Sequence, residues 1–380
     1  MADPTPIPLA QIRKVLIIQG RPFGDVLLNT CYLPRLRKVL PRARIDFLVQ
    51  APYRTVLADN PFLDNLVSYP QARGGRYLFH KLALFRWVRW ARYDLIIDQL
   101  GGTGSAQTVM FSGAAFRIGY AGKRHSRVYS HRVAPPQLEN DDHFLYAATQ
   151  KFFLLKPLGI TPEPYRLWYP IQSASFDYVD GWLAAQNLGS QPPLIVSPGG
   201  PAAKRRWDSA CYAELADLIQ TRLARKVLLL WAPRERPTAE EVKARMASDV
   251  RLAPATTFNQ AAALMSRGAL VICHNGGINH LAAAVGAPCL AVFGKVDPRI
   301  WAPTLFPRQW YLHNPQADHE RDPDFGITPR MMFHGVQRIL AQPLPPQMAD
   351  RSGELPLADP RGPFEPRNLW HPDTLQEACP

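Results

Sequence analysis

Ala269-Leu270-Val271-Ile272-Cys273-His274-Asn275-Gly276-Gly277-Ile278-Asn279-His280 joins an apolar run to a pair of glycines. Its apolar first part predicts a buried strand, and the alanine-rich run that follows, to Gly286, predicts a helix. The two glycines supply the turn between them. A strand, a tight turn and a helix start aim backbone N–H groups and the positive end of a helix dipole at one point. The stretch therefore predicts a phosphate-binding site in an α/β domain.

The first half of the chain alternates strand and helix patterns. Buried strands are expected over residues 14–19, 44–49 and 93–98. A helix is expected from Asp25, as its N-cap, to about Leu40, with a kink at Pro34. A further helix is expected over residues 143–158. Glycine-rich turns follow two of the strands, and ligands of doubly wound sheets bind at such turns.

A second alternating series begins after residues 159–171, which carry three prolines and are expected to form a linker. We therefore expect an α/β protein with two Rossmann-like, doubly wound domains and a cleft between them, over residues 1–172 and 173–340. The last 40 residues, from Ala341, contain nine prolines. Such a composition predicts a tail, residues 341–380, that is extended or disordered and builds no core.

Composition and charge narrow the class of protein. The chain has 380 residues and a net charge of +13, so its surface attracts nucleic acid, anionic lipid or a phosphorylated substrate. Nucleic-acid-binding motifs are lacking, which favours an anionic small substrate or a membrane surface. No apolar run reaches the roughly 18 residues of a membrane span, and the N-terminus has no signal-peptide pattern. Five widely spaced cysteines favour reduced thiols, a cytoplasmic location and no zinc site.

Five motifs follow one another between residues 12 and 340. They are Lys14–Ile18 with Gly24–Leu28, Ser197-Pro198-Gly199 with Lys204-Arg205-Arg206-Trp207, Trp231–Glu235, His274–Ala284 and Phe293–Pro303. In this order they resemble the motifs of the bacterial heptosyltransferases, glycosyltransferase family 9. The resemblance implies a GT-B fold and an inverting transfer of heptose from ADP-heptose to the inner core of lipopolysaccharide. It also implies an anionic glycolipid acceptor and a peripheral position on the cytoplasmic face of the inner membrane.

An inverting transfer needs a base for the acceptor hydroxyl and stabilisation of the departing diphosphate. Asp25 matches the family's base, although it could instead only cap its helix. Lys204 is the expected catalytic cation. The expected donor-binding residues are Gly199, Gly200, Arg205, Glu235, Asn275, Gly276, Gly277 and His280. Which of the two adjacent basic residues takes the family's lysine role stays open, as does the alternative that this run is a solvated lead-in to a helix.

For two of these residues a purely structural role is an alternative to donor binding. His280 is either a donor to a phosphate or a satisfied histidine at a helix start. Glu235 either accepts from a ribose hydroxyl or lies on a charged surface loop. No cofactor or metal is expected beside the nucleotide sugar, because cationic side chains and a helix dipole neutralise a diphosphate without one.

The acceptor is expected to bind at a basic stretch, residues 117–132, with Arg117, Lys123 and Arg124 as candidate contacts. A solvated loop is the alternative for this stretch.

The glycine-rich loop departs from its family. Asn275-Gly276-Gly277 stands where Asp-Thr-Gly is usual, so a carboxylate and a hydroxyl are missing. A neutral amide binds a hydroxyl more weakly than a carboxylate does. A related transferase with another nucleotide sugar, or a non-catalytic binding protein of the same fold, therefore remains an alternative. A dehydrogenase is disfavoured, because Gly20–Gly24 lacks the G-x-G-x-x-G spacing.

Overall fold

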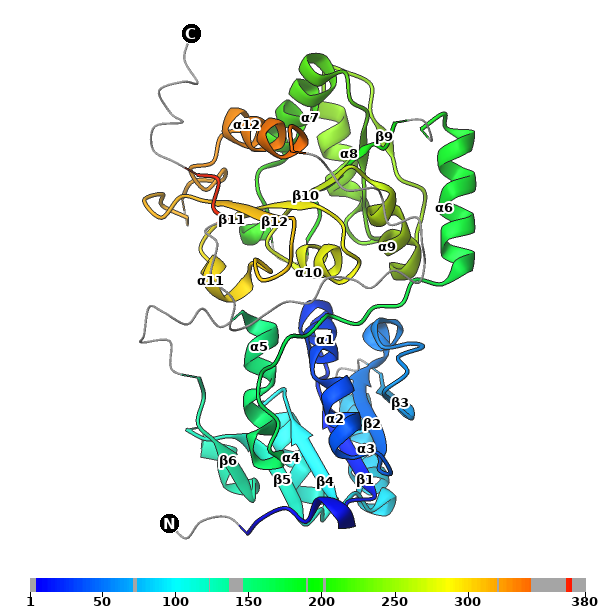
Figure 1. Ribbon diagram of the computed structural model, residues 1–380, viewed down its shortest axis with the longest axis vertical. Coiled ribbons are helices and arrows are strands. Elements are labelled where there is room, and N and C mark those ends of the chain that lie inside the picture. The colour runs from blue at the N-terminus through cyan, green and yellow to red at the C-terminus, as the bar shows by residue number, and fades with distance from the viewer. Residues whose placement is uncertain are drawn as a thin grey trace. The chain divides into compact units, whose positions relative to one another are not determined.

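The computed structural model describes residues 5–70, 74–122, 124–136, 146–188, 191–200, 203–319, 321–342 and 367–370. The chain divides into two compact units between Tyr169 and Pro170. Each unit contains a six-stranded parallel sheet flanked by helices (Figure 1). Two α/β units with parallel sheets confirm the predicted fold class.

The first unit has the strand order β3-β2-β1-β4-β5-β6. Its strands are β1 (Lys14–Ile18), β2 (Arg44–Gln50), β3 (Asn65–Tyr69), β4 (Leu95–Asp98), β5 (Phe116–Tyr120) and β6 (His131–Val133). Its α-helices are α1 (Phe23–Leu28), α2 (Leu33–Val39), α3 (Gly75–Ala91), α4 (Thr103–Ser112) and α5 (Ala147–Lys151). The chain reverses direction between the adjacent strands β1 and β4, which is the topological switch point of a Rossmann sheet.

The second unit repeats this order as β12-β11-β10-β7-β8-β9. Its strands are β7 (Leu194–Ser197), β8 (Val227–Leu229), β9 (Arg251–Leu252), β10 (Leu270–His274), β11 (Cys289–Phe293) and β12 (Gln309–His313). Its α-helices are α6 (Ser173–Ala185), α7 (Ser209–Leu223), α8 (Arg236–Arg245), α9 (Phe258–Arg267), α10 (Gly277–Ala284), α11 (Pro298–Trp301) and α12 (Pro329–Leu340). Here the switch point lies between β7 and β10.

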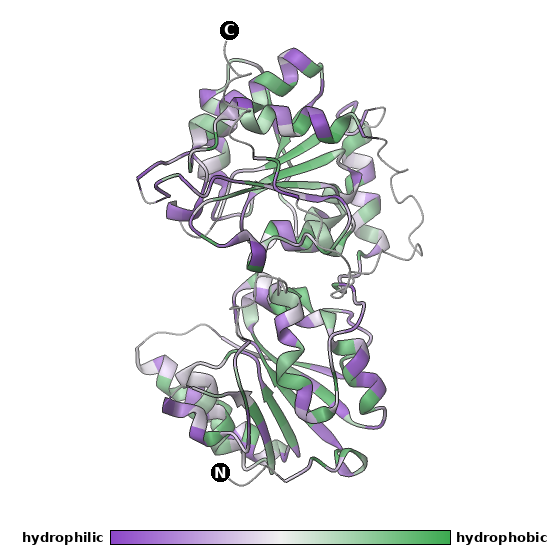
Figure 2. Cartoon of the chain, turned by 60° about the vertical axis from the view of Figure 1, so that its left-hand side comes forward, coloured by the Kyte–Doolittle hydropathy of each residue, from purple (hydrophilic) through white to green (hydrophobic). Residues whose placement is uncertain are grey.

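The central strands are apolar because helices cover both faces of each sheet. Every residue of β7, β10 and β11 is buried. Figure 2 shows the same contrast, with hydrophobic strands inside each unit and mixed colours on the surrounding helices. The long apolar runs of the sequence are therefore the strands that position the loops of the switch points.

The helix expected from Asp25 to Leu40 is two helices. α1 ends at Leu28, a short 3-10 turn covers Asn29–Cys31, and α2 begins at Leu33. Pro34 occupies the first turn of α2, where a missing N–H costs nothing, so it starts a helix and does not kink one. Asp25 lies inside the first turn of α1, and Pro22 holds the N-cap position. The prediction that Asp25 is an N-cap is therefore wrong.

Four strands and three α-helices escaped the sequence patterns. β5, β6 and β12 carry polar or charged residues among their apolar ones, β9 has only two residues, and α4, α11 and α12 were not predicted. The helix expected over residues 143–158 is α5 followed by a 3-10 segment, Phe153–Leu158, and its first three residues lie outside the described ranges. Part of the basic stretch 117–132 consequently forms strands β5 and β6.

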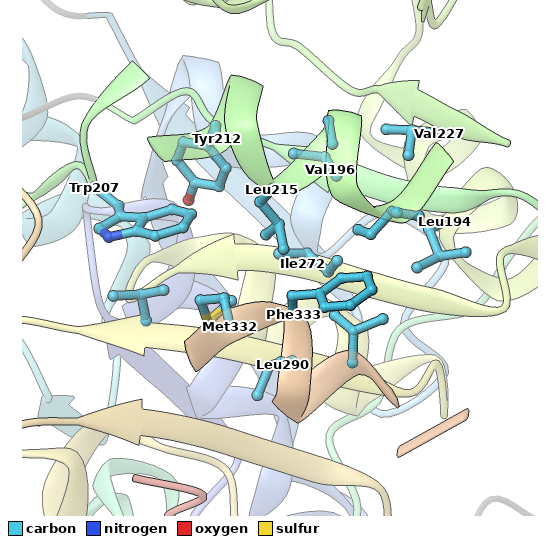
Figure 3. Packing of buried hydrophobic residues seen from close by; sticks show 14 of the residues in the cluster. Leu194, Val196, Trp207, Tyr212, Leu215, Val227, Ile272, Leu290, Met332 and Phe333 are labelled. Atoms are coloured by element: carbon cyan, nitrogen blue, oxygen red, sulfur yellow. The ribbon is translucent and has the colours of Figure 1, made fainter. Parts of the chain in front are cut away.

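A large apolar cluster forms the core of the second unit (Figure 3). Trp207 and Tyr212 pack edge to face in it, with ring centroids 4.9 Å apart. Leu369 and Trp370 also pack against this cluster, and Leu369 N–H donates to the Tyr311 carbonyl at 2.9 Å. The expectation that the tail builds no core is therefore wrong for residues 367–370, and the rest of the tail beyond residue 342 lies outside the described ranges.

Two expectations from composition concern thiols and membrane spans. Cys31, Cys211, Cys273 and Cys289 are free thiols. Within the described ranges, every helix is too short or too polar to cross a lipid bilayer.

Candidate active site

Asp25 lies at the switch point of the first unit. It belongs to α1, which follows β1 directly, and its side chain is 22% exposed. The Asn29 side chain donates to the Asp25 backbone carbonyl at 2.7 Å and ties the start of α1 to the next turn. This position gives a partly exposed carboxylate at the carboxyl edge of the sheet, where ligands of such sheets bind.

Lys151 of α5 is the partner of this carboxylate. Its Nζ lies 3.2 Å from Asp25 Oδ1 and 3.5 Å from Gln19 Oε1. The Gln99 side chain, at the end of β4, donates to the Lys151 carbonyl at 2.9 Å. Among the described residues, the hydrogen bond to the Asp25 side chain reaches Oδ1 alone. Lys151 therefore holds Oδ1 of the carboxylate, and Oδ2 has no hydrogen bond within the part of the chain that the structure describes.

The candidate acceptor residues differ in their surroundings. Arg117 Nε donates to the Val128 carbonyl at 2.7 Å, and Nη1 donates to the Ala114 carbonyl, so the fold already uses this guanidinium. Arg124 is exposed on the 3-10 turn Arg124–Val128. His125 on that turn lies 3.0 Å from the Gly101 carbonyl, so the turn sits at the carboxyl end of β4. Lys123 lies outside the described residues.

In the second unit, three loops meet at the carboxyl ends of β7, β8 and β10. A Cβ atom on Gly199 would lie 2.5 Å from Glu235 Oε2, and one on Gly200 would lie 2.5 Å from His274 Nε2. Both positions therefore need glycine because neighbouring side chains approach the backbone closely. The structure thus brings Gly199 next to Glu235 and Gly200 next to His274.

Glu235 is half-buried at the start of α8, against Gly199. Burial raises the pKa of Glu235, and the nearby charge of Arg206 opposes that shift in part. A half-buried carboxylate beside a glycine loop is a suitable acceptor for hydroxyl donors.

The basic run before α7 separates into one structural and two exposed residues. Trp207 is buried, and its indole N–H donates to the carbonyls of Asp324 and Ile327 at 3.1 and 2.9 Å. Arg206 Nη1 donates to Thr238 Oγ1 of α8 at 2.6 Å. Lys204 and Arg205, by contrast, are exposed. Arg206 therefore holds the loop against α8, and the two basic residues before it are accessible to an anionic ligand.

The glycine loop has the predicted order of strand, turn and helix. Asn275, Gly276 and Gly277 are half-buried between β10 and α10, and Asn275 N–H donates to the Val292 carbonyl at 2.9 Å. The buried Asn279 side chain donates to the Trp301 carbonyl at 3.2 Å. The first turn of an α-helix leaves N–H groups without partners inside the helix. The start of α10 therefore suits an anion, while Asn279 anchors it to α11.

Two histidines at this edge are buried and neutral. Burial lowers the pKa of His280 to about 3, and its ring lies 6.2 Å from that of Trp301. Burial, with the nearby charge of Arg206, lowers the pKa of His274 to about 4. His274 Nδ1 lies 3.2 Å from the Tyr212 hydroxyl, which links the loop to the core in Figure 3. Each imidazole can donate one hydrogen bond but adds no positive charge near neutral pH.

The lowered pKa values of His274 and His280 predict that the folded protein loses stability in acid. Both histidines have a pKa of 6.5 in the unfolded chain, and about 4 (His274) and about 3 (His280) in the folded protein. At a pH between these values the unfolded chain binds more protons than the folded protein, so acidification lowers the free energy of unfolding. At pH 5 each histidine should cost about 2 kcal/mol of unfolding free energy. Urea unfolding of wild type and His280→Gln between pH 6.5 and 5 measures this loss, and the variant should show a shallower slope. Equal slopes would show that His280 protonates readily in the folded state.

Among the residues that the structure describes, no group of three His, Cys, Asp or Glu side chains is placed to hold a metal ion. Positive charges near these loops come from Lys204, Arg205 and Arg206, and from Arg234 and Arg236, which flank Glu235.

Sequence patterns did not single out Lys151 or His274, and they placed Arg206 within a motif without a role of its own. Lys151 is 126 residues from Asp25, and no local pattern reports a contact at that separation. His274 ends an apolar strand, which gave a weak signal for a functional position at the switch point.

Comparison of the chain with known proteins identifies the family that carries these motifs. The profile of Glycosyltransferase family 9 (heptosyltransferase) matches residues 81–324. Lipooligosaccharide heptosyltransferase 2 of Haemophilus influenzae is 25% identical over 354 residues, which are 87% of this chain and 100% of the relative. Lipopolysaccharide heptosyltransferase 3 of Escherichia coli is 25% identical over 299 residues, 74% of this chain and 83% of the relative.

Two solved structures share the fold. The glycosyl transferase family 9 protein of Veillonella parvula has a TM-score of 0.74 and 18% identity, covering 87% of this chain and 97% of its own. E. coli ADP-heptose lipopolysaccharide heptosyltransferase II has a TM-score of 0.68 and 20% identity, covering 87% and 99%. Two Rossmann-like units in this family are the GT-B fold, so the protein is a GT-B glycosyltransferase. The chain belongs to glycosyltransferase family 9, the heptosyltransferase family.

Proposed function

We propose that this glycosyltransferase moves heptose from ADP-heptose to the inner core of lipopolysaccharide with inversion at the anomeric carbon. The observation that carries the proposal is Asp25, a partly exposed carboxylate that Lys151 orients at 3.2 Å in a chain of family 9. The curated relatives are heptosyltransferases of lipooligosaccharide and lipopolysaccharide, and a solved relative is described as an ADP-heptose enzyme.

In the proposed reaction, Asp25 Oδ2 accepts the proton of an acceptor hydroxyl as that oxygen attacks the anomeric carbon. The bond from the anomeric carbon to the diphosphate oxygen breaks, and ADP leaves with the negative charge. Lys204, Arg205 and the N-terminus of α10 stabilise that charge. Direct attack from the face opposite the leaving group inverts the configuration. No metal is needed for these steps.

Glu235 and Asn275 are the proposed contacts to donor hydroxyls. Glu235 lies against Gly199, whereas Asn275 follows β10 on the neighbouring loop. The loops of Gly199, Gly200, Gly276 and Gly277 would hold the diphosphate through backbone N–H groups, with His280 as a neutral donor beside them. Arg124 and Lys123 remain the proposed contacts for an anionic acceptor, and Arg117 supports their loop. We place the enzyme on the cytoplasmic face of the inner membrane, where it would bind no nucleic acid.

Asn275-Gly276 favours a second candidate, a transferase that uses another nucleotide sugar. An amide and a hydrogen stand where the family carries a carboxylate and a hydroxyl, and both changes remove groups that hold a sugar. The retained Asp25 with its Lys151 partner argues against a non-catalytic binding protein, because an unused carboxylate needs no such orientation.

A thermal-shift screen tests the donor. Ligands that bind the folded state raise its stability by mass action, so a concentration 100 times the dissociation constant adds about 2.7 kcal/mol. We expect ADP and ADP-heptose to raise the melting temperature of wild type by several degrees, and UDP, GDP and UDP-glucose to leave it unchanged. A shift with a uridine or guanosine nucleotide and none with ADP would reject the ADP-heptose assignment.

A further inference from the structure

Large apolar side chains gather on the surface of α3 and α4. Eight such side chains are exposed among the described residues, and seven of them lie on these two helices. The seven are Tyr77, Leu78, Phe79, Leu82, Trp90, Met110 and Phe111. Phe79 is 70% exposed and Trp90 is 81% exposed. Large apolar side chains that are exposed on two neighbouring helices mark a candidate interaction surface.

Several of the exposed residues of α3 lie on one face of the helix. With 3.6 residues per turn, Phe79, Leu82, Arg86 and Trp90 share one face of α3, opposite the buried Val88. The helix attaches to its unit through the Val88 side, and Phe85 stacks on Phe111 of α4 with ring centroids 4.5 Å apart. A surface helix normally turns polar residues outward. Here the outward face is apolar and cationic, so it suits a partner that is both apolar and anionic.

The charge of this face has one sign. Residues 75–92 carry five Lys and Arg residues and no acidic one, and α4 carries no charged residue, so the acidic residues between the two helices are Asp94 and Asp98. Asp98 is buried, and Asp94 accepts the backbone N–H groups of Arg13 and Lys14 at 2.8 and 2.9 Å. A surface hollow next to the apolar face is lined by Arg86, Trp87, Arg89, Trp90 and Arg92. Arginine and tryptophan together suit phosphate groups at an apolar boundary.

We propose that the outward face of α3 and α4 docks on the surface of an anionic lipid bilayer. Aromatic side chains favour the headgroup level of a membrane, and an amphipathic basic helix lies in that plane. Phosphates of anionic lipids pair with the arginines, which strengthens binding by about 1 kcal/mol for each basic residue near the surface. The aliphatic side chains of Leu78, Leu82 and Met110 favour lipid over nucleic acid, whose bases stack on aromatic rings.

The helix α3 runs from one edge of the sheet to the other. It begins soon after the carboxyl end of β3, at the sheet edge where α1 carries Asp25, and it ends just before β4, at the opposite edge. A membrane bound to this face would therefore lie along the side of the first unit, from Phe79 near the carboxyl edge to Trp90 near the amino edge. The inference adds a surface to the proposed function and stands or falls separately from it.

Co-sedimentation with vesicles tests the docking. Full-length protein is mixed with vesicles of phosphatidylcholine alone or with 30% phosphatidylglycerol, at low and high salt. We expect wild type to bind the anionic vesicles, and less so at high salt. Phe79→Ser/Trp90→Ser should weaken binding at least tenfold because two inserted rings are lost. Arg76→Gln/Arg86→Gln should weaken it roughly 30-fold and flatten its salt dependence.

Matched controls come from the second unit. Tyr178→Ser removes the eighth exposed apolar side chain, and Arg222→Gln removes an exposed arginine of α7, so both should bind like wild type. Wild type that stays in the supernatant, or double variants that bind fully, would overturn the proposal. The proposal would also be overturned if wild type did not bind vesicles but formed a homodimer or an oligonucleotide complex that Phe79→Ser/Trp90→Ser abolishes.

The result is separable from the enzyme assay. Both double variants should transfer sugar to a water-soluble, deacylated acceptor at the wild-type rate, because the substituted side chains lie outside the candidate site. Absence of transfer by wild type would reject the proposed function and leave the vesicle result as it stands.

Discussion

Asp25→Asn is expected to lower kcat for sugar transfer by two to four orders of magnitude, the usual contribution of a general base. The amide keeps the size of the side chain and can still accept from Lys151 through Oδ1, but it cannot take the acceptor proton. Release of ADP, measured with saturating donor and acceptor, reports the loss. Donor binding should be unchanged, since the candidate donor residues belong to the second unit.

The control is Asp59→Asn, which replaces another aspartate of the first unit at a backbone conformation that asparagine also favours. It should turn over like wild type. Lys151→Met should lower kcat by about tenfold because Asp25 loses its orienting partner, and Lys151→Arg should restore part of the rate. Wild-type turnover in Asp25→Asn would remove Asp25 from the mechanism.

Lys204→Ala is the second substitution with a large expected effect. A positive charge aimed at the leaving diphosphate acts mainly in the transition state, and removing one such group costs about 100- to 1000-fold in kcat. Arg205→Ala should raise KM for the donor more than it lowers kcat, if Arg205 mainly binds the ground state. Steady-state kinetics of both variants separate the two roles.

Lys226→Ala is the matched control, since Lys226 is an exposed lysine of the same unit just before β8, at the opposite edge of the sheet. Its kinetics should equal those of wild type. A larger loss of kcat in Arg205→Ala than in Lys204→Ala would exchange their roles. Normal kinetics in both variants would mean that the diphosphate binds elsewhere.

The strands at the two switch points were predictable from sequence because burial on both faces leaves continuous apolar runs, as in β1, β7 and β10. The edge strands β6 and β12 were not. β6 is only His131–Val133, and in β12, Gln309–His313, polar residues at both ends limit the apolar run to three residues. Pro34 shows a similar limit, because a proline pattern does not reveal whether one helix bends or a new helix starts.

The loops of the candidate site were predictable from motifs, but their mutual contacts were not. Gly199 and Gly200 stood in a motif, yet only the fold shows that Glu235 and His274 fill the space above them. Likewise, the run of basic residues before Trp207 gave no sign that Arg206 bonds to Thr238 of α8. Such contacts join residues that are far apart in sequence, so periodicity and spacing carry no information about them.

A transfer assay with defined substrates tests the central claim most directly. Wild type is incubated with ADP-heptose and a lipopolysaccharide acceptor that lacks its outer heptose, and the product is analysed by mass spectrometry and by NMR of the anomeric centre. We predict an acceptor heavier by one heptose with inverted anomeric configuration, and no such product with Asp25→Asn. A product formed only from another nucleotide sugar, or one with retained configuration, would contradict the proposed reaction.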